Sequence, residues 1–209
     1  VRRFGTDTLH VVDLDERTVQ DVTVGAGLTD MDLSPDGTAL ALMCRDAREL
    51  WVLRTADVDG LATILPFDAD LPLGALAYTP DGQTGLLYTT ASLVDRYVRW
   101  DVQAGTLTTR ALVKPVRSLS IAPSGRDVLI VHRLEDAPDA EASPFIDEWA
   151  LTLVDLDLGL PTPMRLPAEP IDFANSADGR QAYFIMEGEL FLEVLNYETR
   201  LFEEVPVRS

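Results

Sequence analysis

The chain has 209 residues, 46% of them hydrophobic, and its 35 acidic residues against 17 basic ones give a formal net charge of −18. Nucleic acids and anionic membrane surfaces both attract basic residues, so we expect neither as a partner. No stretch approaches the roughly 18 apolar residues of a membrane-spanning helix, which argues against insertion into a membrane.

The first segment, residues 1–27, contains two predicted strands, Thr8–Leu14 and Val19–Val24. Val1–Phe4 would be the tail of a strand before them. These strands match the last two of a four-stranded unit that recurs through the rest of the chain, so we expect a partial unit here.

A turn sequence then returns four times, each time after a short alternating strand and before an apolar run. Its copies are Ser34-Pro35-Asp36-Gly37, Thr79-Pro80-Asp81-Gly82, Pro123-Ser124-Gly125 and Ser176-Ala177-Asp178-Gly179. Proline presets the backbone of such a turn, aspartate tolerates its third position, and glycine accepts a positive φ. We therefore expect Asp36, Asp81 and Asp178 to be turn residues.

The spacing of these turns is close to the roughly 40–50 residues of a propeller blade. The sequence thus predicts an all-β fold, a β-propeller of four-stranded antiparallel blades with four full blades and a partial one. The predicted blades cover residues 28–68, 69–114, 115–168 and 169–209, all within one propeller domain. The second strand of each blade is apolar at nearly every position, as in Ala39–Cys44, Val128–Val131 and Ala182–Met186, which predicts burial of both its faces.

The repeat of an apolar strand, Ser-Pro-Asp-Gly and a second apolar strand is followed by segments such as Leu151-Thr152-Leu153-Val154-Asp155-Leu156. This pattern resembles the WD40-like repeats of TolB-type and YVTN-type bacterial propellers. Members of that family are mostly periplasmic, secreted or surface binding platforms, and some are attached to hydrolases. The resemblance implies a periplasmic or extracellular location.

The chain supplies no free first strand that would close a ring by pairing strands from both termini. We expect a part of a larger propeller of about six to eight blades. A five-bladed ring with one incomplete blade is the alternative.

The sequence carries no recognisable catalytic, metal-binding or cofactor-binding motif. His132 lies at the end of a predicted strand and is expected to be a hydrogen-bonded strand residue, with a ligand role as the alternative. Cys44 lies in an apolar strand and is expected to be buried. The pairs Asp13/Asp15, Asp57/Asp59 and Asp155/Asp157 lack the full ligand set of a calcium loop, which favours polar turns.

The third blade contains an unusually long link between its second and third strands, residues 134–148, acidic at first and then apolar and aromatic. Loops of this length are usually functional or disordered. Such links lie on the propeller face that commonly binds a partner. We expect Phe145, Ile146 and Trp149 to be partner-binding anchors, with Glu135 and Asp136 beside them. Alternatively, the apolar residues fold back over the blade.

Other charged residues at equivalent links are expected on the same face. They are Arg45, Asp46, Arg48, Asp95, Arg96 and Arg133.

These observations favour a non-enzymatic propeller that acts as a protein-interaction or structural scaffold, bound to a protein partner or to further blades of the same protein. One alternative is a lactonase-like hydrolase that uses the central channel, where the first strands contribute Thr29, Asp30, Asp32, Ser118, Ser120 and Asp172. The other is the regulatory propeller of a larger hydrolase.

Overall fold

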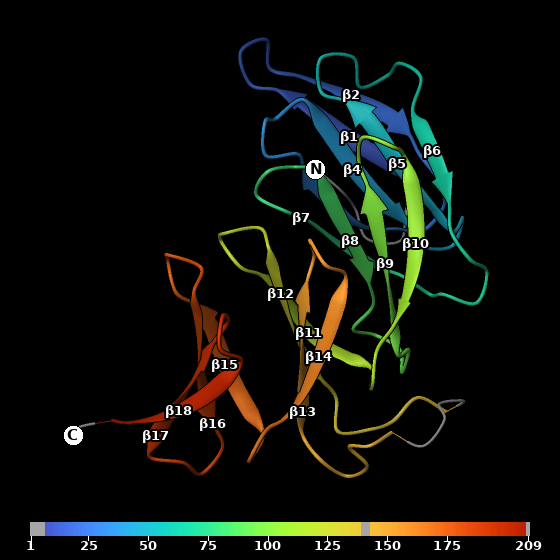
Figure 1. The fold of residues 1–209 in the computed structure, drawn as a ribbon. Coiled ribbons are helices and arrows are strands. Elements are labelled where there is room, and N and C mark those ends of the chain that lie inside the picture. Colours follow the sequence, from blue (N-terminus) through green and yellow to red (C-terminus); the bar gives the residue numbers. More distant parts are fainter. Residues whose placement is uncertain (1–6, 139–142, 208–209) are drawn as a thin grey trace. The chain divides into compact units, whose positions relative to one another are not determined.

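The computed structural model describes residues 7–138 and 143–207 (Figure 1). Within these ranges every regular element is a β-strand, and the strands form four four-stranded antiparallel sheets and one two-stranded sheet. The predicted fold class is thereby confirmed. The same ranges contain no helix that is long and apolar enough to cross a bilayer. The strand tail predicted at Val1–Phe4 and the tip of the long loop, residues 139–142, lie outside the described residues.

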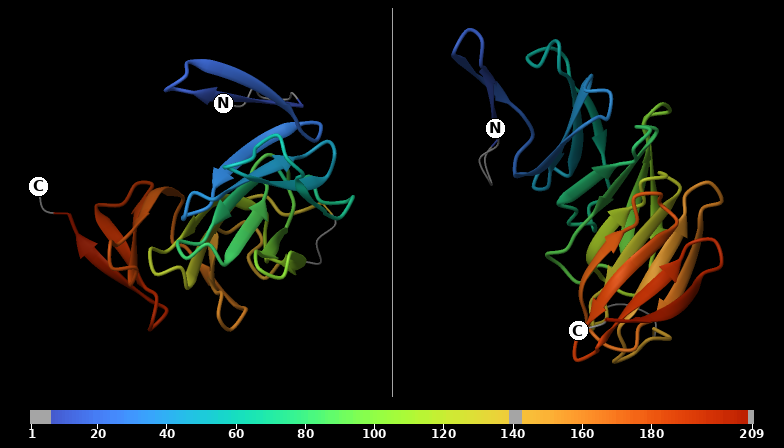
Figure 2. Two further views of the ribbon diagram at one scale, coloured as in Figure 1. Left: turned by 90° about the horizontal axis from the view of Figure 1, so that it is seen from above. Right: turned by 90° about the vertical axis from the view of Figure 1, so that its left-hand side faces the viewer.

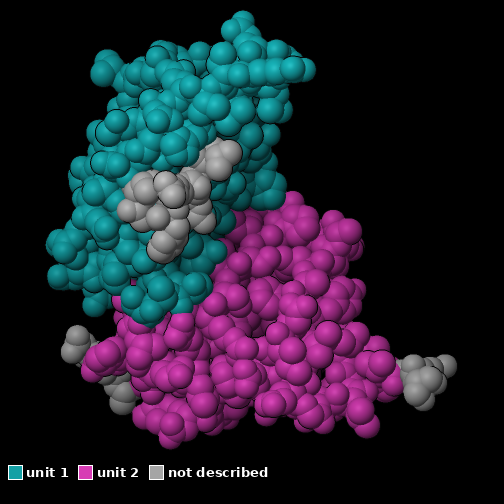
Figure 3. Space-filling model, turned by 180° about the vertical axis from the view of Figure 1, so that it is seen from behind, with its two compact units in different colours: residues 1–92, 96–110 teal, residues 93–95, 111–209 magenta. Residues whose placement is uncertain are grey.

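The chain divides into two compact units, which Figure 3 colours separately and which we describe one at a time. The first comprises residues 1–92 and 96–110, and the second comprises residues 93–95 and 111–209.

The first unit contains a hairpin and two of the four-stranded sheets. The hairpin consists of β1 (Thr8–Asp13) and β2 (Thr18–Thr23). Blade one consists of β3 (Leu28–Leu33), β4 (Ala39–Cys44), β5 (Glu49–Arg54) and β6 (Thr63–Pro66). Blade two consists of β7 (Ala75–Tyr78), β8 (Thr84–Tyr88), β9 (Arg96–Asp101) and β10 (Thr106–Ala111).

The second unit contains the other two sheets. Blade three consists of β11 (Val116–Ile121), β12 (Asp127–His132), β13 (Ala150–Asp155) and β14 (Leu160–Arg165). Blade four consists of β15 (Pro170–Asn175), β16 (Gln181–Met186), β17 (Phe191–Asn196) and β18 (Leu201–Pro206). In all four blades each strand pairs with its sequence neighbours, which is the pattern of an up-and-down meander.

The repeated turns join the first and second strands of each blade, and their aspartates have the predicted turn role. The carboxylate of Asp36 accepts hydrogen bonds from the Ser34 hydroxyl at 2.7 Å and from the Thr38 backbone N–H at 3.0 Å. These hydrogen bonds, with the Ser34 bond as the largest cause, lower the pKa of Asp36. Asp178 binds Ser176 and Arg180 in the same way. The glycine that follows each aspartate has a positive φ, 72° at Gly37 and 68° at Gly179.

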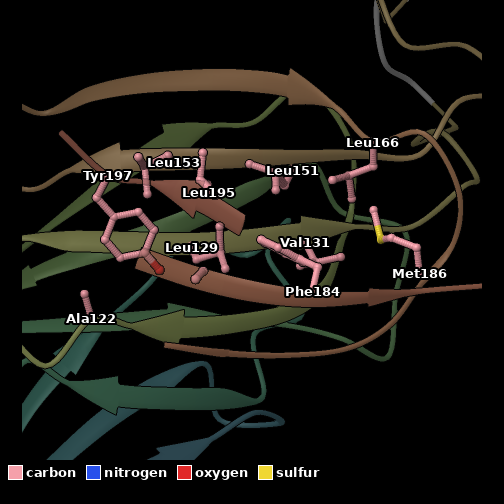
Figure 4. Packing of buried hydrophobic residues seen from close by; sticks show 11 residues of the cluster. Ala122, Leu129, Val131, Leu151, Leu153, Leu166, Phe184, Met186, Leu195 and Tyr197 are labelled. Atoms are coloured by element: carbon pink, nitrogen blue, oxygen red, sulfur yellow. The ribbon is translucent and has the colours of Figure 1, made fainter. Parts of the chain in front are cut away.

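Within the second unit, blades three and four lie face to face (Figure 2). Leu129 and Val131 of β12 pack against Phe184 and Met186 of β16, and all four side chains are at most 1% exposed (Figure 4). Such burial is the main source of stability for sheets that cannot fold alone. In the first unit the hairpin packs on blade one, where Leu9 and Val22 join a cluster with Leu28, Leu42 and Leu53.

One expectation about the second strands is wrong. In β12 every side chain is buried, as predicted, and in β4 the side chains of Ala41–Cys44 are buried while Ala39 and Leu40 are partly buried. In β16, however, burial alternates, and Tyr183 and Ile185 are 38% and 49% exposed. The apolar run has the composition of a strand covered on both faces, but the described residues cover the face that carries Phe184 and leave Tyr183 and Ile185 exposed.

Candidate functional site

The long link between β12 and β13 is held at both ends by a buried lysine. Lys114 lies in the segment between β10 and β11, and its side chain is 0% exposed. Its Nζ donates hydrogen bonds to the backbone carbonyl oxygens of Leu134 at 2.5 Å, Phe145 at 2.9 Å and Glu148 at 3.1 Å. The same nitrogen lies 3.4 Å from a carboxylate oxygen of Asp136.

This arrangement satisfies the chemistry of an ammonium ion. The group has three donors and no acceptor, so three carbonyl oxygens use all its hydrogen-bonding capacity. A buried charge is costly unless it is paired and hydrogen-bonded, and Asp136 supplies the opposite charge. Lys114 therefore ties residues 134–136, at the start of the loop, to residues 145–148, at its end. We call these two segments and Lys114 the lysine-anchored loop.

The end of the loop is a tight turn that displays an apolar side chain. The backbone N–H of Glu148 donates to the carbonyl oxygen of Phe145 at 3.1 Å, and that of Phe145 donates to the Ser143 hydroxyl at 3.1 Å. Asp147 adopts a positive φ of 55°. Ile146, at the outside of this turn, is 54% exposed, whereas Phe145 is partly buried. At the other end of the loop Leu134 is 37% exposed and Glu135 is exposed.

Trp149 has a different environment from Ile146. It is partly buried and packs against the core shared by blades three and four. The Arg117 guanidinium lies 5.1 Å from the centre of the Trp149 ring, and Arg117 also pairs with Glu169 at 2.8 Å. A cation over an indole face is an attractive contact. Trp149 therefore fastens the loop to the sheet and offers little surface to a partner.

A second ion pair joins Glu148, at the end of the loop, to β14. Arg165, at the end of β14, donates from Nε to Glu148 at 2.6 Å, and both side chains are partly or largely exposed. An exposed pair of this kind contributes little stability, so Lys114 is the main anchor.

His132 ends β12 immediately before the loop and is fully buried. Its Nε2 lies 2.7 Å from the Thr152 hydroxyl of the neighbouring strand. Burial lowers the pKa of His132 to about 4, so the imidazole is neutral near pH 7. These contacts match the predicted hydrogen-bonded strand histidine.

The predicted site residues fall in both compact units. Those of the second unit are Asp95, Arg133, Glu135, Asp136, Phe145, Ile146 and Trp149; those of the first are Arg45, Asp46, Arg48 and Arg96. In the first unit, Arg45 donates from Nε to the Leu73 carbonyl at 3.3 Å, which links the β4–β5 turn to the segment before β7. Asp46 and Arg48 are exposed in that turn, and Arg96 is exposed at the start of β9.

Three of the first-strand polar residues considered for a channel hydrolase, Asp30, Asp32 and Ser120, form hydrogen bonds between neighbouring sheets. A carboxylate oxygen of Asp30 accepts from the Leu76 N–H at 3.0 Å, and one of Asp32 accepts from the Tyr78 N–H at 3.2 Å. In the second unit the Ser120 hydroxyl accepts from the Asn175 side-chain amide at 2.8 Å. The polarity of these three residues is thus explained by hydrogen bonds between blades, whereas Thr29 donates to the Met43 carbonyl within its own sheet.

The acidic pairs Asp13/Asp15 and Asp155/Asp157 lie in polar turns, as predicted. The Asp13 carboxylate accepts from the N–H groups of Asp15 and Glu16, and that of Asp155 accepts from those of Asp157 and Leu158. Across residues 7–138 and 143–207, no group of three or more His, Cys, Asp or Glu side chains is arranged to hold a metal ion.

The role of Lys114 was missed by reasoning from sequence. Its partners are carbonyl oxygens 20 to 34 residues away, which carry no residue-type signal. The available hint was that the chain uses arginine for every other basic side chain. A compact ammonium fits a cage of carbonyl oxygens that a planar guanidinium does not.

No known protein family matches the sequence, and no curated protein resembles it. Several solved structures have a similar fold. Dihydro-heme d1 dehydrogenase NirN matches 99% of this chain with a TM-score of 0.66 and 16% identity. A putative 6-phosphogluconolactonase from Bacteroides uniformis matches 96% with a TM-score of 0.62 and 16% identity. TolB from Acinetobacter baumannii matches 97% with a TM-score of 0.54 and 15% identity.

The chain spans 43% of the length of NirN, 64% of the lactonase-like protein and 49% of TolB. At these identities the likeness concerns the fold alone. The chain therefore has a β-propeller-like fold, shared with proteins of varied function.

Proposed function

We propose that this chain is a non-enzymatic propeller module that binds a protein partner through the lysine-anchored loop. The observation that carries the proposal is the Lys114 cage, which fixes a loop whose outermost apolar side chain, Ile146, is 54% exposed. An isolated exposed apolar residue is ordinary. An apolar residue on a fixed turn loses little conformational entropy on binding, and this property suits an anchor residue.

The partner we propose has an apolar pocket for Ile146 and basic residues around it. Glu135 is exposed on the loop, and the chain as a whole carries a net charge of −18. A basic rim would be attracted to such a surface and would increase the association rate. We also propose that the chain belongs with TolB-type and YVTN-type repeats and acts in the periplasm or outside the cell.

A non-enzymatic role is supported by the use of Asp30, Asp32 and Ser120 in bonds between sheets. The alternative is hydrolysis of a lactone, and one structural neighbour carries the name of a putative 6-phosphogluconolactonase. Assay of the purified chain with 6-phosphogluconolactone tests it. Turnover above the spontaneous rate would contradict the non-enzymatic proposal.

Site-specific photo-crosslinking tests the interaction. A photoreactive amino acid at position 146 is expected to capture one protein in the native cell, whereas the same group at Leu158, a 65% exposed turn residue, is not. The captured protein is then purified. Ile146→Asp should raise its Kd by about tenfold or more, because a charge replaces an apolar anchor, and Leu158→Asp should leave the Kd unchanged. Equal effects of the two substitutions would overturn the proposal.

A further inference from the structure

The outer face of blade four, which points away from blade three, carries exposed apolar side chains. Strand pairing places Ile185 opposite Asp172 and Tyr183 opposite Ala174. Tyr183 and Ile185 are 38% and 49% exposed, and Ile171 beside them is 59% exposed. We call Asp172, Tyr183, Ile185 and Ile171 the outer patch of blade four.

The equivalent positions of blades one and three are completely covered. In blade one, Met43 and Ala41 lie opposite Asp30 and Asp32 and are 0% exposed. In blade three, Val131 and Leu129 lie opposite Ser118 and Ser120 and are at most 1% exposed. The following blade supplies this cover in both cases, blade two over blade one and blade four over blade three.

Asp172 repeats the geometry of Asp30 in detail. Each residue follows a register shift in the first strand of its blade, at Pro170/Asp172 and at Leu28/Asp30. Each accepts a hydrogen bond on Oδ1 from the next residue, from the Phe173 N–H at 2.8 Å and from the Met31 N–H at 3.0 Å. The second oxygen of Asp30 accepts from the Leu76 N–H of the following blade. Asp172 is exposed and presents the same acceptor outward.

We infer that the outer patch of blade four docks one further four-stranded sheet of the same repeat, whose first strand donates a backbone N–H to Asp172 and whose apolar face covers Tyr183 and Ile185. This surface is separate from the lysine-anchored loop, and the inference does not depend on the proposed partner.

The docked sheet belongs to a longer form of this polypeptide. A second copy is a poor occupant, because the hairpin covers blade one, blade one covers blade two, and blade three covers blade four. The outer face of the hairpin, with Val12 and Val19, is exposed, but its described sheet has two strands and lacks the first strand that would donate to Asp172. The similar structures contain more chain than these 209 residues, which leaves length for another sheet.

The test compares thiol accessibility in two forms of the protein. Ile185→Cys is introduced into the 209-residue chain and into the longest polypeptide that the same reading frame encodes. A maleimide should label the introduced thiol rapidly in the 209-residue chain and at least about tenfold more slowly in the longer polypeptide, because labelling of a covered thiol requires local opening. Native Cys44, which is 0% exposed, is the buried control, and Leu14→Cys, at a position 83% exposed, is the accessible control.

Asp172→Ala provides a second readout. It should lower the unfolding midpoint of the longer polypeptide more than that of the 209-residue chain, since only the longer form would lose a bond between sheets. Equal labelling rates at position 185 in the two forms, or a reading frame that encodes no further sheet, would overturn the inference. Protection in the 209-residue chain that rises with its concentration would assign the patch to a second copy and would also overturn it.

Discussion

A carboxylate oxygen of Asp30 accepts a hydrogen bond from the backbone N–H of Leu76, 46 residues further along the chain. The bond joins the first strand of blade one to the first strand of blade two, and Asp32 repeats it with Tyr78. Edge strands leave backbone groups unpaired, and these carboxylates satisfy two of them. Asp30 and Asp32 of β3 are thus part of the packing between sheets.

Asp30→Ala is expected to lower the free energy of unfolding by about 2 kcal/mol, because it leaves the backbone N–H of the buried residue Leu76 without its acceptor. Urea denaturation, followed by tryptophan fluorescence, measures the loss. Asp172→Ala in the 209-residue chain is the matched control, since it removes the same bond to the following residue without a bond between sheets. Equal losses for the two variants would contradict the role given to the Leu76 bond.

Lys114→Met should destabilise the second unit by about 3 kcal/mol, because three carbonyl oxygens and Asp136 lose a buried cation. Thermal unfolding measures the effect, and limited proteolysis should show faster cleavage within residues 134–148. Arg165→Met removes only the exposed pair with Glu148 and should cost less than about 1 kcal/mol. A Lys114→Met variant as stable and as resistant as the wild type would refute the anchoring role.

The stability of the protein should depend on His132 between pH 6.5 and about 4. The pKa of His132 is about 4 in the folded state against 6.5 in the unfolded state, because burial disfavours the imidazolium. In that interval the unfolded chain binds more protons, so the contribution is full above pH 6.5 and falls by about 3 kcal/mol as the pH decreases to 4.

His132→Gln removes the titrating group and leaves a polar side chain opposite Thr152. Its free energy of unfolding, compared with that of the wild type across this pH range, should decline less steeply in acid. Parallel pH profiles for the two proteins would show that His132 does not contribute.

Cys44 should be inert in the folded protein. It is 0% exposed, and burial raises the pKa of its thiol to about 12. Because the thiolate is the reactive form, Ellman's reagent at pH 8 is expected to give no reaction under native conditions and one thiol per chain in denaturant. Rapid reaction of the native protein would indicate that blade one opens readily.

The fold was predictable because its signals are local. Three of the four repeated turns combine a hydroxyl, an aspartate and a glycine within four residues, and the contacts of Asp36 and Asp178 are made within two residues of each aspartate. Strand identity followed from the apolar runs on either side. The prediction that both faces of β16 are buried was wrong at Ile185. An apolar composition shows that a strand is suited to burial, whereas the exposure of Ile185 depends on whether another sheet lies beside it.

The candidate site was predictable only in part. The length and composition of residues 134–148 marked the loop, and Ile146 is displayed on it. The sequence did not separate Ile146 from Trp149, because the difference lies in the tertiary contacts of Trp149 with Arg117 and with the core. The roles of Asp30 and Asp32 could not be predicted from the sequence either, because their carboxylates accept hydrogen bonds from backbone N–H groups of another blade.

The enclosure of Lys114 has a practical consequence for chemical modification. It is the chain's single lysine, and its ε-amine is fully buried with every donor engaged. Amine-reactive dyes, crosslinkers and acetylating enzymes should therefore find no ε-amine to attack on these 209 residues in the folded state, and labelling of Lys114 would report that the lysine-anchored loop has opened.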